Sequence, residues 1–320
     1  MESSNGVLNP PVSAKAARIC ASCAQAMAAG APVTVSVFAP DAPGVTTVDD
    51  STRGPAWVSV PGDHSAEADG AAYQAGGVVP WQVLAGVAVA APAGWSTVVA
   101  FGDSITAGYQ DAGVAGHPTW PELLAARAAG AGCSVSVVNE GISANQLTAD
   151  ASSHFGGGPA GLRRFAGDVL AQPGLREVIV DLGINDLAAA PRLGVPDPVT
   201  HLEQGYRALV AAAHDRGVRV LGATLSPAGD PAHPTTFLGT YSTAAGDAER
   251  ARLNRWIRTS HTFDGVIDFA RALRSGTDPN TLATGDDSGD HLHPSDTGYG
   301  AMVAVIPPAL LPGCAPVRAR

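Results

Sequence analysis

The sequence has little lysine, few aromatic residues and little charge. Lys15 is the single lysine, aromatic residues make up 5% of the 320 residues and charged residues 15%, and 29 acidic against 19 basic residues give a formal net charge of -10. A nucleic-acid surface needs clustered positive charge. The arginines are dispersed, and the solvated side of a helix is expected to carry Arg250, Arg252, Arg255 and Arg258. We therefore expect no nucleic-acid partner.

Long apolar runs are absent as well. Gly, Pro or a charged residue interrupts each stretch before it reaches the roughly 18 residues of a membrane-spanning helix. Residues 1–30 also lack the basic start and directly following apolar run of a signal peptide. We predict no transmembrane segment and little order in residues 1–30. The compartment and the oligomeric state stay open.

Cysteine is scarce, with Cys20, Cys23, Cys133 and Cys314 as the four present. The C-x-x-C pair of Cys20 and Cys23 has neither the second pair nor the histidine spacing of a structural zinc site. Disulfides within Cys20–Cys23 and Cys133–Cys314, or buried free thiols, account for the pattern equally well. We expect no metal site.

Glycine, proline and apolar residues are abundant: 38 Gly, 25 Pro and 45% hydrophobic residues suit a folded, loop-rich chain. Between residues 31 and 93, the short apolar pieces PVTVSVFAP, AWVSV and WQVLAGVAVAAP alternate with turn-forming clusters. This pattern predicts a small β-rich N-terminal region at 31–93. Structural support and sugar binding are its two candidate roles.

From residue 94 to 320 the pattern changes to alternating strands and helices. Strands are expected at Ser96–Phe101, Val135–Val138, Val178–Leu182, Val218–Ala223 and Val266–Phe269. Helices are expected at Trp120–Ala129, His201–Arg216, Thr243–Ser260 and Pro294–Ile306. This alternation predicts an α/β domain with three layers, a parallel central sheet covered by helices on both faces.

Polar residues follow the expected strands, where open parallel sheets bind their ligands. The segments that carry these polar residues are Gly102-Asp103-Ser104, Asn139-Glu140-Gly141, Gly183-Ile184-Asn185-Asp186 and the later loop Asp290-His291-Leu292-His293. Because the carboxyl ends of parallel strands lie at one edge, these four segments are expected to converge there.

Ser104 and His293 suit the roles of nucleophile and base. A serine hydroxyl reacts only when a base takes its proton, and a histidine side chain, with an ordinary pKa of about 6.5, suits that task near neutral pH. Asp290, three positions before His293, is placed to orient the ring. His291 competes with His293 for the base role, and we favour His293.

Acyl transfer also needs donors for the negative charge on the carbonyl oxygen. The backbone N–H of Ser104, the side-chain amide of Asn185 and the backbone of Gly141 are the predicted donors. Glycine at position 141 would allow close approach of a substrate. The sequence thus predicts an oxyanion hole with three donors.

At this point the blocks VVAFGDSITAG, NEGISAN, LGINDL and DHLHP resemble, in order, the SGNH hydrolases, also called GDSL-like esterases. The resemblance implies a flavodoxin-like αβα sandwich over about Ser96 to Pro308. Its family-defining positions would be Ser104, Gly141, Asn185 and His293, with Asp290 as third triad member. The pieces VTVSVFAP, GDH and WQVLAGVAV resemble bacterial members with a β-rich N-terminal extension, often described as carbohydrate esterases or arylesterases.

Each block has an ordinary interpretation when taken alone. G-D-S is a common turn or helix cap, G-x-N-D a turn, and the Asp286–His293 loop, with its acidic and histidine residues, lacks the spacing of an EF-hand or an H-E-x-x-H metal site. An α/β-hydrolase is disfavoured because Thr106 stands where G-x-S-x-G needs its last glycine. Four blocks in order after successive strands favour catalysis.

We therefore expect a serine ester hydrolase that cleaves short-chain carboxylic esters through an acyl-enzyme and needs no cofactor. The expected partner is a small ester substrate, with an acetylated carbohydrate or an aryl ester as candidates. Lipase and thioesterase activity are alternatives with the same chemistry. The alternative from another class is a carbohydrate-binding or scaffolding protein whose triad is vestigial.

Overall fold

The computed structural model describes residues 35–38, 48–67, 69–82, 86–108, 117–150, 157–229, 241 and 243–314. The chain divides into two compact units, residues 1–85 and 86–320. This division falls at residue 86, whereas the sequence places the start of the α/β domain at residue 94. The role assigned to each part stays a prediction, and residues 1–30, including Cys20 and Cys23, lie outside the described residues.

The N-terminal unit contains a two-stranded antiparallel sheet of β1 (Val48–Ser59) and β2 (Tyr73–Gln82). Its register shifts between Asp49 and Arg53 and again between Ala56 and Trp57. The predicted piece AWVSV lies at the end of β1. The piece WQVLAGVAVAAP begins with the last two residues of β2, Trp81 and Gln82, whereas the described residues 35–38 and 86–92 of the other two pieces form no strand.

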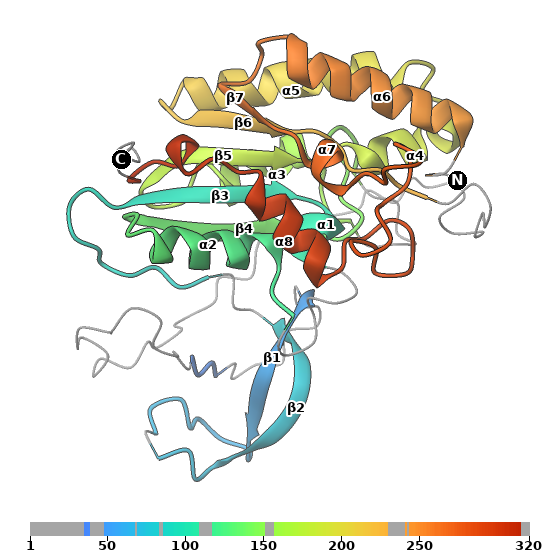
Figure 1. Cartoon of the computed structure of the whole chain (residues 1–320). Coiled ribbons are helices and arrows are strands. Elements are labelled where there is room, and N and C mark those ends of the chain that lie inside the picture. The colour runs from blue at the N-terminus through green and yellow to red at the C-terminus, as the bar shows by residue number, and fades with distance from the viewer. Residues whose placement is uncertain are drawn as a thin grey trace, which may run out of the picture. The chain divides into compact units, whose positions relative to one another are not determined.

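The second unit is built on five parallel strands in the order β4-β3-β5-β6-β7 (Figure 1). They are β3 (Ser96–Gly102), β4 (Val135–Gly141), β5 (Leu175–Asp181), β6 (Arg219–Ala223) and β7 (Gly265–Ile267). The first strand, β3, lies next to the edge strand β4, and the later strands β5, β6 and β7 follow in order on the other side of β3. This is the strand order of flavodoxin-like folds. The predicted parallel α/β sheet is confirmed.

Helices connect the strands and cover both faces of the sheet. They are α1 (Ser104–Ala107), α2 (Trp120–Gly130), α3 (Gly161–Asp168), α4 (Ile184–Leu193), α5 (Pro198–His214), α6 (Ala244–Thr259), α7 (Phe269–Leu273) and α8 (Asp296–Ala304), followed by a 3-10 turn at Pro308–Leu310. Thr119 begins α2 with a capping box shared with Glu122, and Thr243 caps α6.

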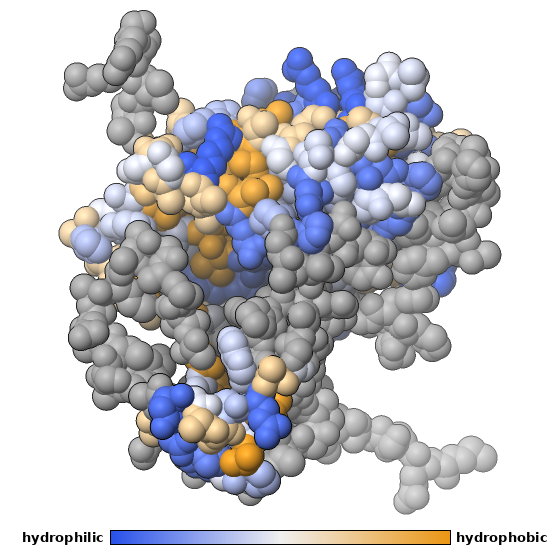
Figure 2. All heavy atoms as spheres, turned by 60° about the horizontal axis from the view of Figure 1, so that its bottom comes forward, coloured by the Kyte–Doolittle hydropathy of each residue, from blue (hydrophilic) through white to orange (hydrophobic). Residues whose placement is uncertain are grey.

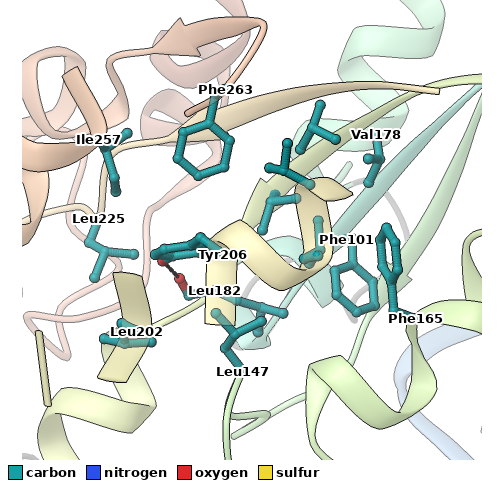
Figure 3. Close-up of a cluster of buried hydrophobic side chains, with 14 of the residues drawn as sticks. Phe101, Leu147, Phe165, Val178, Leu182, Leu202, Tyr206, Leu225, Ile257 and Phe263 are labelled. Atoms are coloured by element: carbon teal, nitrogen blue, oxygen red, sulfur yellow. Dashed lines mark hydrogen bonds between the residues drawn. The ribbon is translucent and has the colours of Figure 1, made fainter. Parts of the chain in front are cut away.

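The strands are buried on both faces, as their continuous apolar runs predict. In β3, Val98 and Ala100 pack with α2, α7 and α8, whereas Val99 and Phe101 pack with α3, α5 and α6. Figure 3 shows the second of these clusters, in which Phe101 meets Phe165, and Tyr206 lies between leucine side chains and Phe263. Two cores thus fix the sheet from both sides.

The LGINDL segment, for which a turn is the ordinary interpretation when it is taken alone, opens α4, because Gly183 at φ 128° lets the chain enter the helix directly after β5. One local prediction needs correction. Arg250 was expected on a solvated helix face with its neighbours, but it is buried. Its guanidinium donates to Asp247 at 3.0 Å and to Asn280 at 3.0 Å, which accounts for a buried charge on α6.

A disulfide joins Cys133 to Cys314, one of the two pairings left open by the sequence. Among the described residues, no helix combines the length and apolar character needed to span a bilayer. The large exposed hydrophobic side chains include Trp57, Val58 and Val89. On the face drawn in Figure 2, the described hydrophobic residues are bordered by hydrophilic ones.

Candidate active site

Ser104 stands where β3 passes into α1, at the carboxyl edge of the sheet. Asp103 caps this short helix by accepting a hydrogen bond from the N–H of Ile105 at 3.0 Å. The next turn closes at Gly108, which has φ 95° and donates to the carbonyl of Ser104 at 2.9 Å. These local contacts fix the Ser104 backbone. The residue is buried, with 8% of its surface exposed.

His293 reaches Ser104 from a loop 189 positions later in the chain. Its Nε2 lies 2.9 Å from the hydroxyl oxygen of Ser104, and its Nδ1 lies 2.6 Å from Oδ2 of Asp290. The structure therefore brings together all three residues that the sequence assigned to a triad, in the order hydroxyl, imidazole, carboxylate. This is the arrangement in which the carboxylate orients a ring that can accept the serine proton.

Asp290 is held as an anion by its surroundings. Burial works to raise the pKa of Asp290, but the hydrogen bond and charge of the His293 ring and the backbone N–H groups of His293 and Leu292 outweigh it, and the pKa falls well below its ordinary value. Those N–H groups donate to Oδ1 at 2.8 and 3.0 Å. The carboxylate therefore stays ionised while it orients the ring.

The competing histidine, His291, belongs to a different pair. Its Nδ1 lies 2.6 Å from Oδ2 of Asp287, and its side chain is 39% exposed. The backbone of His291 has φ 65°, which turns the loop so that neighbouring histidines point to different partners. Of the two, His293 is the one that contacts Ser104.

Asn185 lies in the first turn of α4 and is buried. Its amide nitrogen donates to the carbonyl of Asn145 at 3.0 Å and to Oδ2 of Asp103 at 3.3 Å. Its amide oxygen accepts from the hydroxyl of Tyr241 at 2.6 Å. The side chain therefore links the loops after β3, β4 and β5 at the edge where Ser104 lies.

Gly141 has different surroundings from those expected of an oxyanion donor. Its N–H donates to Oδ1 of Asn139 at 2.9 Å. A Cβ at this position would lie 2.2 Å from the backbone nitrogen of Ala107, so glycine is required because β4 packs against α1. In this structure the N–H of Gly141 already has an acceptor, and the predicted role would require that contact to open.

Ala144, three residues further on, was missed by sequence reasoning. It has φ 61° in the turn closed by the hydrogen bond from the N–H of Asn145 to the carbonyl of Ile142, 3.0 Å. A left-handed backbone at a residue other than glycine is uncommon and often marks a functional site. Among the described residues, none accepts a hydrogen bond from the N–H of Ala144. In a sequence, glycine is the usual sign of a left-handed backbone, so an alanine in this conformation cannot be predicted from the residue type.

Two buried charged residues hold the loop that carries Ala144. Asp186 accepts from the N–H groups of Leu147 and Thr148 at 2.8 and 2.9 Å. Arg164 donates to Oδ1 of Asn145 at 3.0 Å and to the carbonyl of Gly102 at 3.0 Å. Burial raises the pKa of Asp186 and lowers that of Arg164, against their hydrogen bonds. Together they tie this loop to the ends of β3 and β5.

Further carboxyl groups lie beneath the site. Burial raises the pKa of Asp181 to about 7, against a hydrogen bond from Thr106. Burial and the nearby charge of Asp181 also raise the pKa of Asp103 well above its usual value. Burial and their mutual repulsion therefore work against ionisation of both carboxyls at once.

Comparisons with known proteins agree with this architecture. Residues 100–301 match the model of the GDSL-like Lipase/Acylhydrolase family. A lipase/acylhydrolase structure from Enterococcus faecalis is 26% identical, with 66% of this chain and 93% of that chain covered and a TM-score of 0.47. A carbohydrate acetylesterase family member from Sinorhizobium meliloti is 20% identical, with 67% and 97% covered and a TM-score of 0.50, and supports the fold. No curated protein matches the sequence.

Proposed function

This chain belongs to the GDSL-like lipase/acylhydrolase family and is a hydrolase of ester bonds, and from that premise we propose that it is a serine esterase working through an acyl-enzyme. The observation that carries the proposal is the continuous chain from Ser104 Oγ to His293 Nε2, 2.9 Å, and from His293 Nδ1 to Asp290, 2.6 Å. An alternative function as a binding protein with a vestigial triad does not require these contacts.

In the proposed first step, His293 Nε2 accepts the proton of Ser104 while Oγ attacks the carbonyl carbon of the ester. The tetrahedral intermediate collapses, the bond to the alcohol oxygen breaks, and the His293 proton passes to that oxygen. Water then gives a proton to His293 and attacks the acyl group on Ser104. The acid leaves and the serine regains its proton, so atoms and charge balance without a cofactor.

The proposed oxyanion donors are the backbone N–H of Ser104, the amide of Asn185 and a third N–H from the loop after β4. Gly141 remains the prediction from sequence. The N–H of Ala144 is the better-supported candidate, because it has no acceptor among the described residues and its neighbour Asn145 contacts Asn185 at 3.0 Å. The left-handed backbone at φ 61° would then serve to aim this N–H.

We further propose short-chain acyl esters as substrates, with acetylated carbohydrates and aryl acetates as the first classes to test. The sequence resemblance of the N-terminal pieces to carbohydrate esterases and arylesterases supports this choice. The Sinorhizobium meliloti structure named as a carbohydrate acetylesterase family member is consistent with it. Lipase or thioesterase activity would appear as a preference for long acyl chains or thioesters in the same assay.

Hydrolysis of a chromogenic acetate by the wild type and by Ser104→Ala tests the proposal. Loss of roughly three to six orders of magnitude in kcat is expected if the triad operates. The matched control is Ser136→Ala, a serine near the amino end of β4, whose hydroxyl contacts Thr97 at 3.2 Å. Wild-type hydrolysis that continues at the same rate in Ser104→Ala would refute the mechanism. A wild type with no hydrolysis above background would favour the vestigial alternative.

A further inference from the structure

Asn185 can serve the oxyanion only if its amide nitrogen, rather than its oxygen, faces the reacting carbonyl. On one side, the carbonyl of Asn145 lies 3.0 Å from the amide. A backbone carbonyl only accepts hydrogen bonds, so the nitrogen must lie there and the amide oxygen must face the opposite way. The amide oxygen then needs a hydrogen-bond donor on the opposite side, and the group found there decides whether this orientation of the amide is stable.

Tyr241 occupies that position. Its hydroxyl lies 2.6 Å from Oδ1 of Asn185, and the residue stands just before α6. Burial and the nearby charge of Asp103 raise the pKa of Tyr241 above its usual value, so the hydroxyl keeps its proton over the working range of an esterase. Because the amide oxygen can only accept, the tyrosine hydroxyl is the donor in this contact.

We propose that Tyr241 is a positioning residue for ester hydrolysis, acting through Asn185. Its hydroxyl holds the amide plane so that the nitrogen is presented to the oxyanion. By donating to the amide oxygen it also polarises the amide, which makes the amide N–H a stronger donor. This inference rests on the proposed function, since it requires Asn185 to bind the developing negative charge.

The contacts of Asn185 also show why such help is needed. Its nitrogen already donates to Asn145 and, at 3.3 Å, to Asp103. The oxyanion must share or replace the longer of these two contacts during reaction. Without the Tyr241 hydroxyl, a buried amide oxygen would lack this donor at the moment when its nitrogen changes partners, and the side chain could rotate away.

A double-mutant cycle on the full-length protein tests the inference, with a chromogenic acetate as substrate. Tyr241→Phe keeps the ring and removes the donor; kcat should fall about threefold to tenfold, as for one hydrogen bond, with KM little changed. In the Asn185→Ala background, which should itself lose about 10²–10³ in kcat, adding Tyr241→Phe should cost nothing further.

Tyr206→Phe is the matched control. It removes another buried hydroxyl of the same core, which donates to the carbonyl of Leu182 and not to Asn185. Any loss that it causes should be the same with and without Asn185. A second variant keeps the test independent of folding: 3-fluorotyrosine at position 241 retains ring and hydroxyl and strengthens the donor, so kcat should equal or exceed that of the wild type.

The outcomes separate the two levels of the account. Full activity of Ser104→Ala would remove the proposed function itself. With Ser104→Ala inactive and Asn185→Ala impaired, the Tyr241 inference is overturned if Tyr241→Phe matches the wild type, or if its loss persists undiminished in the Asn185→Ala background. A fluorotyrosine enzyme as slow as Tyr241→Phe would also overturn it.

Discussion

Two carboxylates in the last loop, Asp290 and Asp287, each hold a histidine at 2.6 Å, yet only one pair reaches Ser104. The loop therefore contains its own control for the effect of an Asp–His contact. The two pairs differ in the backbone of His291, whose positive φ turns its side chain to a different side from that of His293, the histidine that contacts Ser104.

Asp290→Asn should lower kcat by roughly 10³–10⁴, because the amide would hold the imidazole in the wrong tautomer. Asp287→Asn, which changes the pair that does not contact Ser104, should cost less than tenfold. Initial rates with a chromogenic acetate measure both. Equal losses in the two variants would show that the loop's order, and not the contact to Ser104, is what activity requires.

Glu177, on β5, is a fully buried carboxyl remote from the chemistry. Arg219 lies 2.9 Å from its Oε2, but among the described residues neither carboxyl oxygen accepts a well-directed hydrogen bond. Burial raises the pKa of Glu177 to about 7, while Arg219 works against the shift. Burial dominates, since one ill-directed ion pair does not replace full hydration.

This shift makes stability depend on pH with a definite sign. Between about pH 4.5 and 7 the unfolded chain releases the Glu177 proton and the folded chain keeps it, so the free energy of unfolding falls as pH rises. The difference in free energy of unfolding between Glu177→Gln and the wild type should therefore grow in favour of the variant from pH 5 to pH 8, by on the order of 3 kcal/mol. Urea unfolding at both pH values measures it; a constant difference would contradict the assignment.

At the scale of elements, the site depends on β4 packing against α1 through Gly141. Gly141→Ala should destabilise the fold by about 3 kcal/mol, because the new methyl group would meet the backbone of Ala107 and overpack the contact. Gly167→Ala is the control: it lies in α3, has open space around it, and should gain about 0.5–1 kcal/mol.

Denaturant unfolding of both glycine variants distinguishes packing from catalysis. A Gly141→Ala protein as stable as the wild type but without activity would restore the oxyanion role predicted from sequence. A protein with reduced stability and residual activity would instead agree with the observed contact between β4 and α1.

Sequence patterns predicted the elements well where hydrophobic runs decide them. The five expected strands lie within a few residues of β3 to β7, and the long helices begin at Thr119 and Thr243 caps that are visible in the sequence. Helices α3, α4 and α7 were missed, because α3 and α7 are short and α4 begins inside a turn motif. Local composition does not distinguish a glycine turn from a glycine that starts a helix.

The residues proposed to act on the substrate could be predicted from the sequence, whereas the residues that hold them in place could not. Ser104 and Asn185 follow the ends of β3 and β5, His293 lies in the loop before α8, and all three carry recognisable chemistry. Arg164 and Tyr241 were not found, since each acts through contacts with residues far away in the chain. Tertiary contacts of that kind leave no local signal in one sequence.

At the scale of the molecule, the disulfide between Cys133 and Cys314 joins residues 181 positions apart, at the start of β4 and the end of the described chain. Replacing both cysteines by alanine should lower the free energy of unfolding by about 2–5 kcal/mol, because the unfolded chain regains the entropy of a long open loop. The hydrogen bond from Ser134 N–H to Gly313, 3.0 Å, should keep the segments together in the folded state.

Denaturant unfolding of Cys133→Ala/Cys314→Ala measures this effect, with kcat as the companion value. We expect stability to fall and kcat to stay near that of the wild type, since the disulfide lies at the amino edge of the sheet, opposite Ser104. An unchanged free energy of unfolding would show that the crosslink does not constrain the unfolded chain.

Rapid acid quench of the enzyme during turnover of a chromogenic acetate, followed by peptide mass spectrometry, tests the central claim most directly. The account predicts one acetyl group on the peptide that contains Ser104, appearing with a burst of released alcohol and absent from Ser104→Ala. Steady hydrolysis with an acetyl group on another residue, or sustained by Ser104→Ala at the wild-type rate, would contradict it.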